Sequence, residues 1–511
     1  MNRNCNRIIV AFLFVVSFLL TSCYKEDIID IEQYNKNFIK LNDIKCAFDK
    51  NSNTYYYPIN KLNINNFQPI VEYKFNNDKI ILNGLDIKNN AIVIFNELLI
   101  NEPYIIKIVN GKNIVNEYNL VFLTIPIIEV FTYTDIIDEP KKHAIIRISE
   151  PILNTYNKEF QYEFNIGIEI RGGISLGYDK KSYSFELWTD EFKSGKINYP
   201  ILDLRNDDDW IIDGMYLDSA RMRNRVSFDI WNKINNVPHI YREPDAINGI
   251  NGKFVILLIN NKYQGLYCLN EEIDRKQLKL REFYNSYGGV IYKGTGWSDV
   301  TRFNSIDELV DSDFWLGWEQ KYPDYDQYPY WKPLYEVIDF VVNSTDDEFK
   351  NEISNYFNIK NLVDYFIYVN LIKASDNVGK NQILARYDEN STFFFVPWDM
   401  DCTWGRIFTT EKISYLHIVT NNLFDRLLST NANNYKNMLK VRWNELNETT
   451  FNIDSLINHY YNYMNLFNEN GLIEKEIECW DQNFKIENEI NYIKWWIENR
   501  KEYLNTYFND L

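Results

Sequence analysis

The chain has 511 residues and a formal net charge of −18 at pH 7, and 45% of its residues are hydrophobic and 16% aromatic. This length is typical of two or three domains, and the apolar content is sufficient for a large buried core. The negative charge argues against nucleic acid as a partner, because that binding depends on Lys and Arg at phosphates. The His residues are scattered and the Cys residues form no Cys-x-x-Cys pair, which argues against a zinc site, a disulfide framework and a Ser-His-Asp triad.

Residues 1–22 are predicted to be a lipoprotein signal peptide. Arg3 and Arg7 precede an apolar run that is too short to span a bilayer as a helix, which takes roughly 20 apolar residues. Cys23 follows Leu-Thr-Ser, which resembles a bacterial lipobox, so we expect it to become the lipidated first residue; the alternative is an ordinary signal peptide with an incidental cysteine. Residues 23–40 would form a tether whose Lys-Glu-Asp resembles a surface-export signal, or is a solvated charged linker. We therefore expect an outer-membrane lipoprotein that is exposed at the cell surface.

Residues 41–127 contain short runs rich in Ile, Val, Tyr and Phe, such as 70–75, 91–95 and 104–109. Asn-rich turns separate these runs, and apolar residues show no helical period. This spacing predicts a small β-sandwich-like domain. We expect it to be a spacer or a binding module, because it carries no motif of catalytic chemistry.

Residues 128–511 are predicted to form a second, larger domain that begins with β-strands. Residues 220–234 then carry apolar side chains at four-residue steps, which predicts an amphipathic helix. Two apolar strands, 253–259 and 265–269, follow and are joined through Asn260-Asn-Lys, a hairpin signal. Strands, one helix and a hairpin come in the order of the N-terminal lobe of a protein kinase.

The second half of this domain is predicted to be mainly helical. Residues 300–350 are rich in Asp, Trp, Tyr and Pro and are interpreted as a variable insertion, and 359–375 is predicted to be an apolar helix. A helical C-terminal part is expected over about 407–511. Its candidate helices are 413–428, 435–446, 453–467 and 487–508. The fold class is therefore α+β.

The most informative segment begins where the predicted helix 359–375 ends. Asp376 and Asn381 are separated by four residues, the spacing at which protein kinases place a proton-accepting Asp and a metal-binding Asn. Asp399 and Asp401 follow at the end of a predicted strand. Such carboxylate and amide oxygens form a site suited to Mg²⁺ with nucleotide phosphates. Taken singly, Asp376 could instead end a helix, and Asp399 and Asp401 could anchor a β-turn.

Six short motifs resemble one protein family and occur in the order of that family. They are Arg171-Gly-Gly-Ile-Ser, Lys180-Lys-Ser-Tyr-Ser-Phe-Glu-Leu, Asp209-Trp-Ile, Met222-Arg-Asn-Arg, Tyr263-Gln-Gly-Leu-Tyr and Trp398-Asp-Met-Asp. From about residue 128 onwards the chain thus resembles the spore coat protein H (CotH) kinase family. The resemblance implies a two-lobed atypical protein-kinase-like fold, with ATP and Mg²⁺ or Mn²⁺ as cofactors.

Phosphoryl transfer needs a metal across the phosphates, positive charge on their oxygens and a hydroxyl held in line. We expect Asp376 to orient the hydroxyl and to accept its proton. Asn381 and Asp399 are expected to hold the metal. Asp401 is expected to be a further metal ligand or a brace for the loop.

Positive charge is expected from the strands before the predicted helix 220–234. Lys181 is predicted to contact phosphate, because it opens a strand after the Gly-containing turn that starts at Arg171; a plain β-turn with surface lysines is the alternative. Arg171, Arg223 and Arg225 form a further basic set, since Arg suits bidentate phosphate contact. These arginines could equally form ion pairs with acids such as Glu272. Glu272 follows the hairpin where a kinase hinge would be, and it is a candidate nucleotide contact.

The leading hypothesis is an atypical Mg²⁺- and ATP-dependent protein kinase that phosphorylates Ser or Thr of a secreted or surface protein. The acidity of the chain suggests a basic substrate. Two alternatives stay open. One is the same fold with another nucleotide-transfer reaction, such as transfer of AMP. The other is a catalytically inactive surface lipoprotein that binds glycan or host protein.

Overall fold

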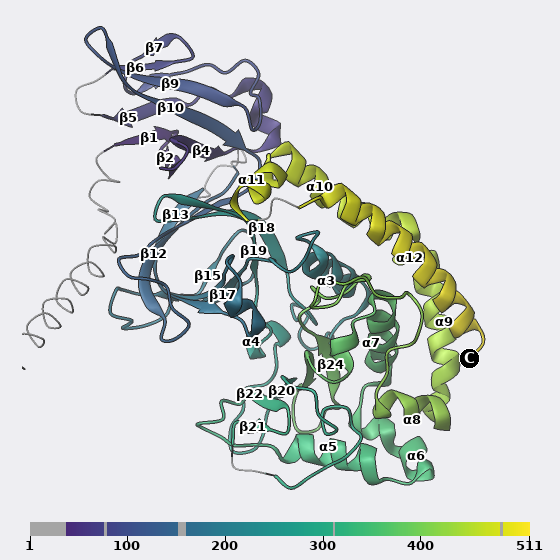
Figure 1. The fold of residues 1–511 in the computed structure, drawn as a ribbon. Coiled ribbons are helices and arrows are strands. Elements are labelled where there is room, and N and C mark those ends of the chain that lie inside the picture. The colour runs from purple at the N-terminus through teal and green to yellow at the C-terminus, as the bar shows by residue number, and fades with distance from the viewer. Residues whose placement is uncertain (1–36, 76–78, 152–159, 310–311, 481–483) are drawn as a thin grey trace, which may run out of the picture.

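The structure is a computed structural model that describes residues 37–75, 79–151, 160–309, 312–480 and 484–511. The predicted signal peptide, Cys23 and most of the predicted tether lie outside these ranges. The described chain mixes α-helices and β-strands, as predicted, and begins with a β-rich region (Figure 1). Among the described helices, none is long and apolar enough to cross a membrane.

The N-terminal region contains two β-sheets. The first has the strand order β2 (Ile44–Lys45), β1 (Phe38–Leu41), β5 (Ile70–Lys74) and β8 (Ala91–Ile92). The second has the order β3 (Ala47–Asp49), β4 (Thr54–Pro58), β10 (Asn113–Leu123), β9 (Pro103–Asn110), β6 (Lys79–Leu82) and β7 (Leu85–Ile87). Leu41 and Val71 of the first sheet pack with Tyr57 and Phe122 of the second in one core. Two sheets that share one core make this region a β-sandwich.

The next region is a closed β-barrel. Its strand order is β11 (Ile127–Phe131), β12 (Lys142–Ser149), β13 (Gln161–Arg171), β14 (Ser182–Trp188), β17 (Asp209–Asp213), β19 (Lys262–Asn270) and β18 (Gly252–Ile259). The barrel closes through a parallel pairing of β11 with β18, in which Ile127 lies opposite Ile256. Apolar side chains such as Ile146, Phe185 and Leu257 fill its interior. A separate pair, β15 (Tyr199–Pro200) and β16 (Asn206–Asp207), lies in the connection between β14 and β17.

The predicted order of strands, helix and hairpin is confirmed within this barrel region. Helix α3 (Arg223–Ile234) follows β17, and the β18–β19 hairpin turns at Asn260 and Asn261. Their φ angles of 53° and 56° are left-handed, as a two-residue hairpin turn requires. The closure of the strands into a barrel was not indicated by the sequence. A two-lobed kinase-like arrangement stays a prediction.

A five-stranded sheet lies beyond the barrel. Its order is β21 (Phe314–Trp315), β22 (Trp318–Tyr322), β20 (Val290–Gly294), β23 (Gln382–Arg386) and β24 (Phe394–Pro397). The helices around it are α4 (Arg275–Leu278), α5 (Lys332–Asn343), α6 (Asp346–Tyr356) and α7 (Ile359–Ile372). The segment 300–350, which the sequence suggested to be an insertion, supplies β21 and β22. Because β22 pairs with β20, this segment is part of the central sheet.

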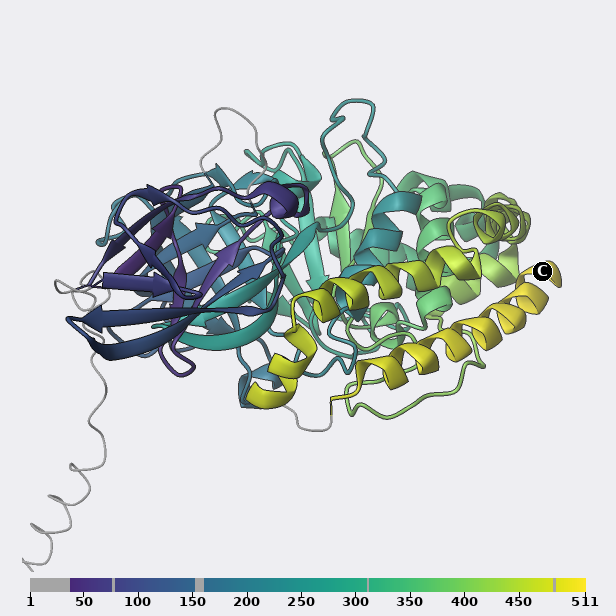
Figure 2. The same cartoon turned by 90° about the horizontal axis from the view of Figure 1, so that it is seen from above.

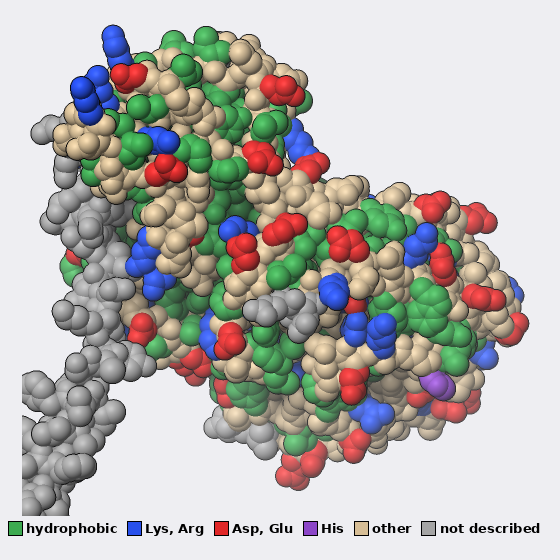
Figure 3. Space-filling view, turned by 45° about the horizontal axis from the view of Figure 1, so that its top comes forward, with side chains coloured by type: hydrophobic (Ala, Val, Ile, Leu, Met, Phe, Trp, Pro, Cys, Tyr) green, Lys and Arg blue, Asp and Glu red, His purple; other side chains and the backbone are tan. Residues whose placement is uncertain are grey.

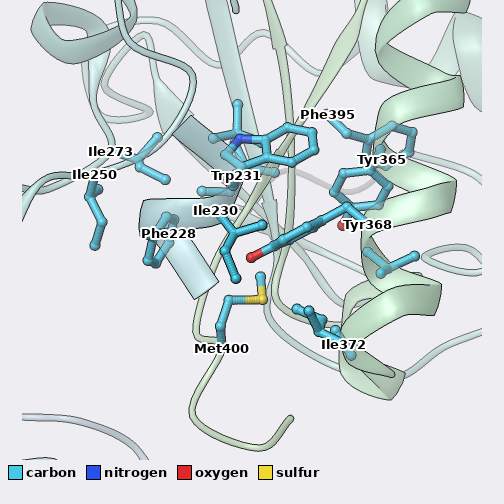
Figure 4. Packing of buried hydrophobic residues seen from close by; sticks show 14 of the residues in the cluster. Phe228, Ile230, Trp231, Ile250, Ile273, Tyr365, Tyr368, Ile372, Phe395 and Met400 are labelled. Carbon is cyan, nitrogen blue, oxygen red and sulfur yellow. The ribbon is translucent and has the colours of Figure 1, made fainter. Parts of the chain in front are cut away.

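Aromatic side chains join α3, α7 and the sheet (Figure 4). The ring of Trp231 on α3 lies 4.9 Å from that of Tyr368 on α7. The ring of Phe395 on β24 stacks on Tyr365 of α7, with 4.6 Å between centroids. Helix α7 is buried from Asn361 to Ile372, and Met400 packs into the same core just after β24. This packing fixes the ends of α7 and β24, where the predicted catalytic residues begin.

The C-terminal part is helical, as predicted. Its helices are α8 (Asn422–Thr430), α9 (Tyr435–Glu448), α10 (Ile453–Glu469), α11 (Leu472–Cys479) and α12 (Ile486–Asn509). Helices α10 and α12 run side by side along the outside of the molecule (Figures 1 and 2).

One predicted helix begins later than expected. The prediction was 413–428, but α8 begins at Asn422, because the Asn421 side chain caps it by accepting a hydrogen bond from the Phe424 amide at 3.3 Å. Before this cap, the Ser414 and Leu416 carbonyls accept hydrogen bonds from Lys373 Nζ, at 2.5 and 2.8 Å, in place of helical N–H donors.

The β-sandwich is bound to the rest of the chain by polar contacts. The Gln161 side chain accepts from the Lys45 amide at 3.0 Å and donates to the Lys45 carbonyl at 2.8 Å. The Thr124 amide donates to Asn470 Oδ1 at 2.6 Å, which links the end of the sandwich to the end of α10.

On the face seen in Figure 3, acidic side chains are dispersed among basic and hydrophobic ones.

Candidate functional site

Six of the predicted site residues meet in one cleft of about 640 Å³. Those that line it are Arg171, Glu272, Asp376, Asn381, Asp399 and Asp401. Arg171 ends a barrel strand and Glu272 follows the β18–β19 hairpin, whereas the other residues belong to the segments after α7 and β24. The cleft therefore has one wall from the barrel and one from the helix and sheet beyond it.

The loop that carries Asp376 is fixed by its own backbone and by one buried side chain. Helix α7 ends before Lys373, which takes a left-handed φ of 53°. The chain then makes a single 3-10 turn, η3 (Ser375–Val378), that contains Asp376. The buried Asn377 donates hydrogen bonds to the Asn381 carbonyl at 2.5 Å and to the Trp398 carbonyl at 2.8 Å. These bonds tie the loop after α7 to the end of β24.

Asn381 and Asp399 meet at one end of the five-stranded sheet. Strands β23 and β24 are antiparallel, with Gln382 opposite Pro397, so the residues just outside this pair are neighbours. Asn381 Nδ2 donates to Asp399 Oδ2 at 3.1 Å. Both residues have left-handed backbones, with φ of 53° and 60°. Such conformations are uncommon for residues other than glycine, and they occur more often at functional sites.

Carboxyl groups in the cleft are held close to one another. Desolvation, followed by the charge of Asp399, raises the pKa of Asp401 well above its ordinary value. Desolvation also raises the pKa of Asp213, another cleft residue, which accepts hydrogen bonds from the Met215 amide at 2.9 Å and from Ser182 Oγ at 3.2 Å. A cation between these carboxyl groups would favour their ionised forms.

The donor set fits a hard cation such as Mg²⁺. In the described ranges, no three His, Cys, Asp or Glu residues lie close enough together to hold a metal by themselves. A metal in the cleft would therefore also need the Asn381 amide oxygen, water and substrate phosphate. That is how Mg²⁺ commonly binds, through one or two carboxylates together with phosphates and waters.

The predicted phosphate-binding lysine is not in the cleft. Lys181 Nζ donates to the Leu176 carbonyl at 2.8 Å, whereas its neighbour Lys180 lines the cleft. Lys180 is fully buried and forms an ion pair with Glu476 of α11 at 2.7 Å. Lys181 thus contacts the backbone of its own turn, and its predicted contact with phosphate stays a prediction.

The three arginines have different surroundings. Arg171 lines the cleft, but Arg223 is fully buried and forms ion pairs with Asp218, at 2.6 Å, and with Glu489. Arg225 pairs with Asp229 at 3.0 Å. Arg223 and Arg225 thus belong to ion-pair networks within the protein, and the acids in those networks do not include Glu272.

Arg223 nevertheless supports the site. Its Nε donates to the Thr403 carbonyl at 3.0 Å, and Thr403 lies two residues after Asp401. The next helical residue, Asn224, lines the cleft and accepts a hydrogen bond from the Met400 amide at 3.0 Å. The start of α3 therefore holds both ends of the short segment that carries Asp401.

Comparison with known proteins identifies the family of this chain. The family model described as CotH kinase protein matches residues 168–504. The chain belongs to the CotH kinase family. It is also similar to the inner spore coat protein H of Bacillus subtilis (strain 168), with 22% identity over 321 residues, which cover 62% of this chain and 80% of that protein.

Several cleft residues of this CotH family protein were not predicted. They are Asp213, Asn224, Lys293, Lys380 and Trp398. Asn224 and Trp398 stand inside two of the family motifs, and Asp213 follows a third, so closer attention to those motifs could have found them. Lys293 lies on β20, outside every motif, and no local sequence signal marks it.

Proposed function

We propose that this CotH family protein is an atypical Mg²⁺- and ATP-dependent protein kinase that phosphorylates Ser or Thr of a partner outside the cytoplasm. The observation that carries the proposal is the convergence of Asp376, Asn381 and Asp399 with Arg171 in one cleft. The membership of a family described as kinase proteins supports it further.

Each cleft residue then has one task in phosphoryl transfer. Asp376 accepts the proton of the attacking hydroxyl and orients its oxygen towards the phosphate. Asn381, Asp399 and Asp401 would hold Mg²⁺, which when bound neutralises charge on the phosphate oxygens. Arg171 contacts phosphate through its guanidinium, and Glu272 is positioned to contact the nucleotide from the barrel wall.

The hydrogen bond from Asn381 to Asp399 keeps these two side chains at a fixed separation before any ligand is bound. Preorganised groups of this kind lower the barrier because they need no rearrangement during the reaction. The Asn377 bonds to the Asn381 and Trp398 carbonyls serve the same purpose for the backbone.

Transfer of phosphate to protein tests the proposal. The purified protein is incubated with γ-labelled ATP, Mg²⁺ or Mn²⁺, and basic or Ser-rich acceptor proteins, and products are weighed by intact-mass spectrometry. We expect label transfer with the added mass of one phosphate. Asp376→Ala and Asp399→Ala should each reduce transfer by at least about 100-fold, since each removes a group that acts in the transition state.

Asp347→Ala is the matched control, because Asp347 is an exposed acid in the first turn of α6, and it should leave transfer unchanged. A product that carries the mass of AMP would replace the kinase proposal with nucleotide transfer. If the protein shows no metal-dependent nucleotide binding, the alternative of a catalytically inactive surface-binding protein is preferred.

We also propose that the protein is an outer-membrane lipoprotein anchored through Cys23. The lipobox-like sequence before this residue supports the proposal. In a Gram-negative host, Cys23→Ser should move the protein from the membrane fraction to the soluble fraction and remove the lipid from the intact mass. Membrane association of the variant equal to that of the wild type would contradict it.

A further inference from the structure

Three isoleucines stand together on the outer face of the first sheet of the β-sandwich. Ile70 lies opposite Ile92 in the pairing of β5 with β8. The next pair is hydrogen-bonded, since the Val93 amide donates to the Pro69 carbonyl at 3.0 Å. Ile70 and Ile92 thus form a non-hydrogen-bonded pair, in which the side chains of two strands are closest. Ile94 follows two residues later and therefore points to the same face.

These three side chains, which we call the isoleucine patch, are apolar and yet exposed. Their exposed fractions are 49% for Ile70, 64% for Ile92 and 60% for Ile94. The alternate residues Val71 and Val93 are buried in the core of the sandwich. Single exposed apolar side chains are normal on a protein, but neighbouring ones on one face mark a site of interaction.

Lysines accompany the isoleucine patch on the same sheet. Lys40 on β1 pairs with Glu72 on β5 at 3.3 Å. Lys74 follows Ile70 by four residues on β5 and so shares its face, and Lys88 is exposed in the turn before β8. Within the described ranges, neither Lys74 nor Lys88 forms an ion pair. Two exposed cations without an internal partner are therefore available to an anionic surface.

The charge of the chain is distributed unevenly between its regions. Residues 37–127 contain nine Lys and eight Asp or Glu, so their net charge is +1. Residues 128–511 contain 41 Lys or Arg and 60 Asp or Glu, so their net charge is −19. An anionic surface would repel this second region strongly and the sandwich hardly at all. The sandwich is therefore the part of the chain that can approach such a surface.

The proposed lipid anchor brings the same face within reach of a membrane. Strand β1 begins at Phe38, 15 residues after Cys23. A segment of this length spans at most about 50 Å when it is fully extended. The sheet has β2 at one edge and β8 at the other, and β2 contacts the barrel through Lys45 and Gln161. The isoleucine patch thus lies at the edge away from the barrel, in the region to which the anchor is joined.

We propose that the isoleucine patch, together with Lys74 and Lys88, docks on the anionic phospholipid surface of the membrane that holds the Cys23 lipid. The isoleucines enter the boundary between headgroups and acyl chains, and the lysines contact lipid phosphates. The anchor raises the effective concentration of the patch at the membrane, so a weak contact is sufficient. The inference rests on the proposed anchor for its location and on no catalytic activity.

A second copy of the chain is the other occupant to consider. Strand β8 is an edge of its sheet, and edge strands can pair with strands of other molecules. However, β8 spans only Ala91–Ile92, which offers few backbone groups for pairing. Self-association would also bring together two regions with a net charge of −19 each. Both observations favour the membrane.

Vesicle binding without the anchor tests the inference. The mature chain, residues 23–511 with Cys23→Ser, is sedimented with phosphatidylethanolamine vesicles that contain or lack phosphatidylglycerol. We expect binding to the vesicles with phosphatidylglycerol, and weaker binding in high salt. Ile92→Thr with Ile94→Thr should lower the bound fraction at least about 5-fold, because it removes apolar surface and keeps β-branched side chains. Lys74→Glu with Lys88→Glu should lower it to a similar extent.

A matched control uses another pair of exposed apolar side chains. Ile114 and Val115 lie on β10 of the second sheet and have exposed fractions of 57% and 51%. Ile114→Thr with Val115→Thr should leave vesicle binding unchanged. The Tm of every variant should stay within about 2 °C of the parent protein, because each altered side chain is exposed.

Three results would overturn the inference. The first is absence of binding to phosphatidylglycerol vesicles at millimolar lipid, and the second is an equal loss of binding in the control pair. The third is a dimer, detected by light scattering, that Ile92→Thr with Ile94→Thr converts to monomers, because the patch would then bind a second copy. None of these measurements depends on phosphate transfer or on lipidation, so failure of either proposal above is distinguishable from failure of this one.

Discussion

The buried carboxylate of Glu476 allows a quantitative prediction about stability. Glu476 on α11 is fully buried and accepts four hydrogen bonds. Lys180 Nζ donates to its two oxygens at 2.7 and 2.9 Å, Arg221 Nε donates at 2.9 Å, and the Leu266 amide donates at 2.9 Å. Glu476→Gln keeps the shape of the side chain and removes its charge, so two buried cations lose their counter-ion.

Loss of one partner of a buried ion pair costs about 3–5 kcal/mol, because the remaining charge stays desolvated. Residues 128–511, about 380 residues, would have an unfolding entropy of about 0.8 kcal/mol/K at roughly 2.1 cal/mol/K per residue. If this region unfolds as one unit, a loss of 3–5 kcal/mol lowers its Tm by about 4–6 °C.

Differential scanning calorimetry at pH 7 measures this difference. Glu474→Gln is the matched control, because Glu474 is an exposed acid on the same helix and should change the Tm by less than about 1 °C. The reasoning fails if Glu476→Gln melts within 1 °C of the wild type. That result would mean that water reaches Lys180 and Arg221 and replaces the carboxylate.

Three further substitutions test other parts of the structure. Phe395→Ala empties a fully buried site and should lower the free energy of unfolding by about 3–5 kcal/mol, measured by urea denaturation. Gly288→Ala should cost more than about 2 kcal/mol and reduce soluble yield, because its φ is +126° and an added Cβ would lie 2.5 Å from the Glu282 carbonyl oxygen; a wild-type Tm would contradict this. Burial opposes ionisation of Glu186, but Lys141 and neighbouring donors hold its pKa at about 2, below the ordinary 4.5. Its ionised form therefore stabilises the fold above about pH 4.5, and this contribution is lost as the pH falls towards 2. Glu186→Gln should lower the Tm by a few degrees at pH 7, and the difference from the wild type should shrink in acid.

The sequence predicted most accurately those structural features that depend on residues close together in the chain. Asp376, Asn381 and Asp399 lie within one short stretch, and the antiparallel strands β23 and β24 between Asn381 and Asp399 return the chain to the same sheet end. Their convergence therefore followed from spacing alone. Helices with clear apolar periodicity, such as α9 and α10, were placed within a few residues for the same reason.

Features set by distant residues could not be read from the sequence. Side chains alternate between the two faces of a strand, so the sequence alone did not show which of Lys180 and Lys181 faces inwards. The ion pair with Glu476 on α11 selects Lys180. Arg223 forms a buried ion pair with Glu489, which lies 266 residues away in the chain, and so does not line the cleft. Lys293 joins the cleft because β20 pairs with β23, and no motif surrounds it.

The seam that closes the barrel has a consequence for how the chain acquires its fold. Strand β11 cannot complete its pairing in the barrel until β18 has formed, because Ile127 pairs with Ile256, roughly 130 residues later in the chain. Contacts between such distant segments slow folding, since the entropy of closing the loop is lost before any pairing compensates it. Until then the newly made strands present unpaired edges, which favour association with other chains. Substitutions at the β11–β18 seam are therefore expected to reduce the yield of folded protein in the cell before they reduce the activity of the molecules that do fold.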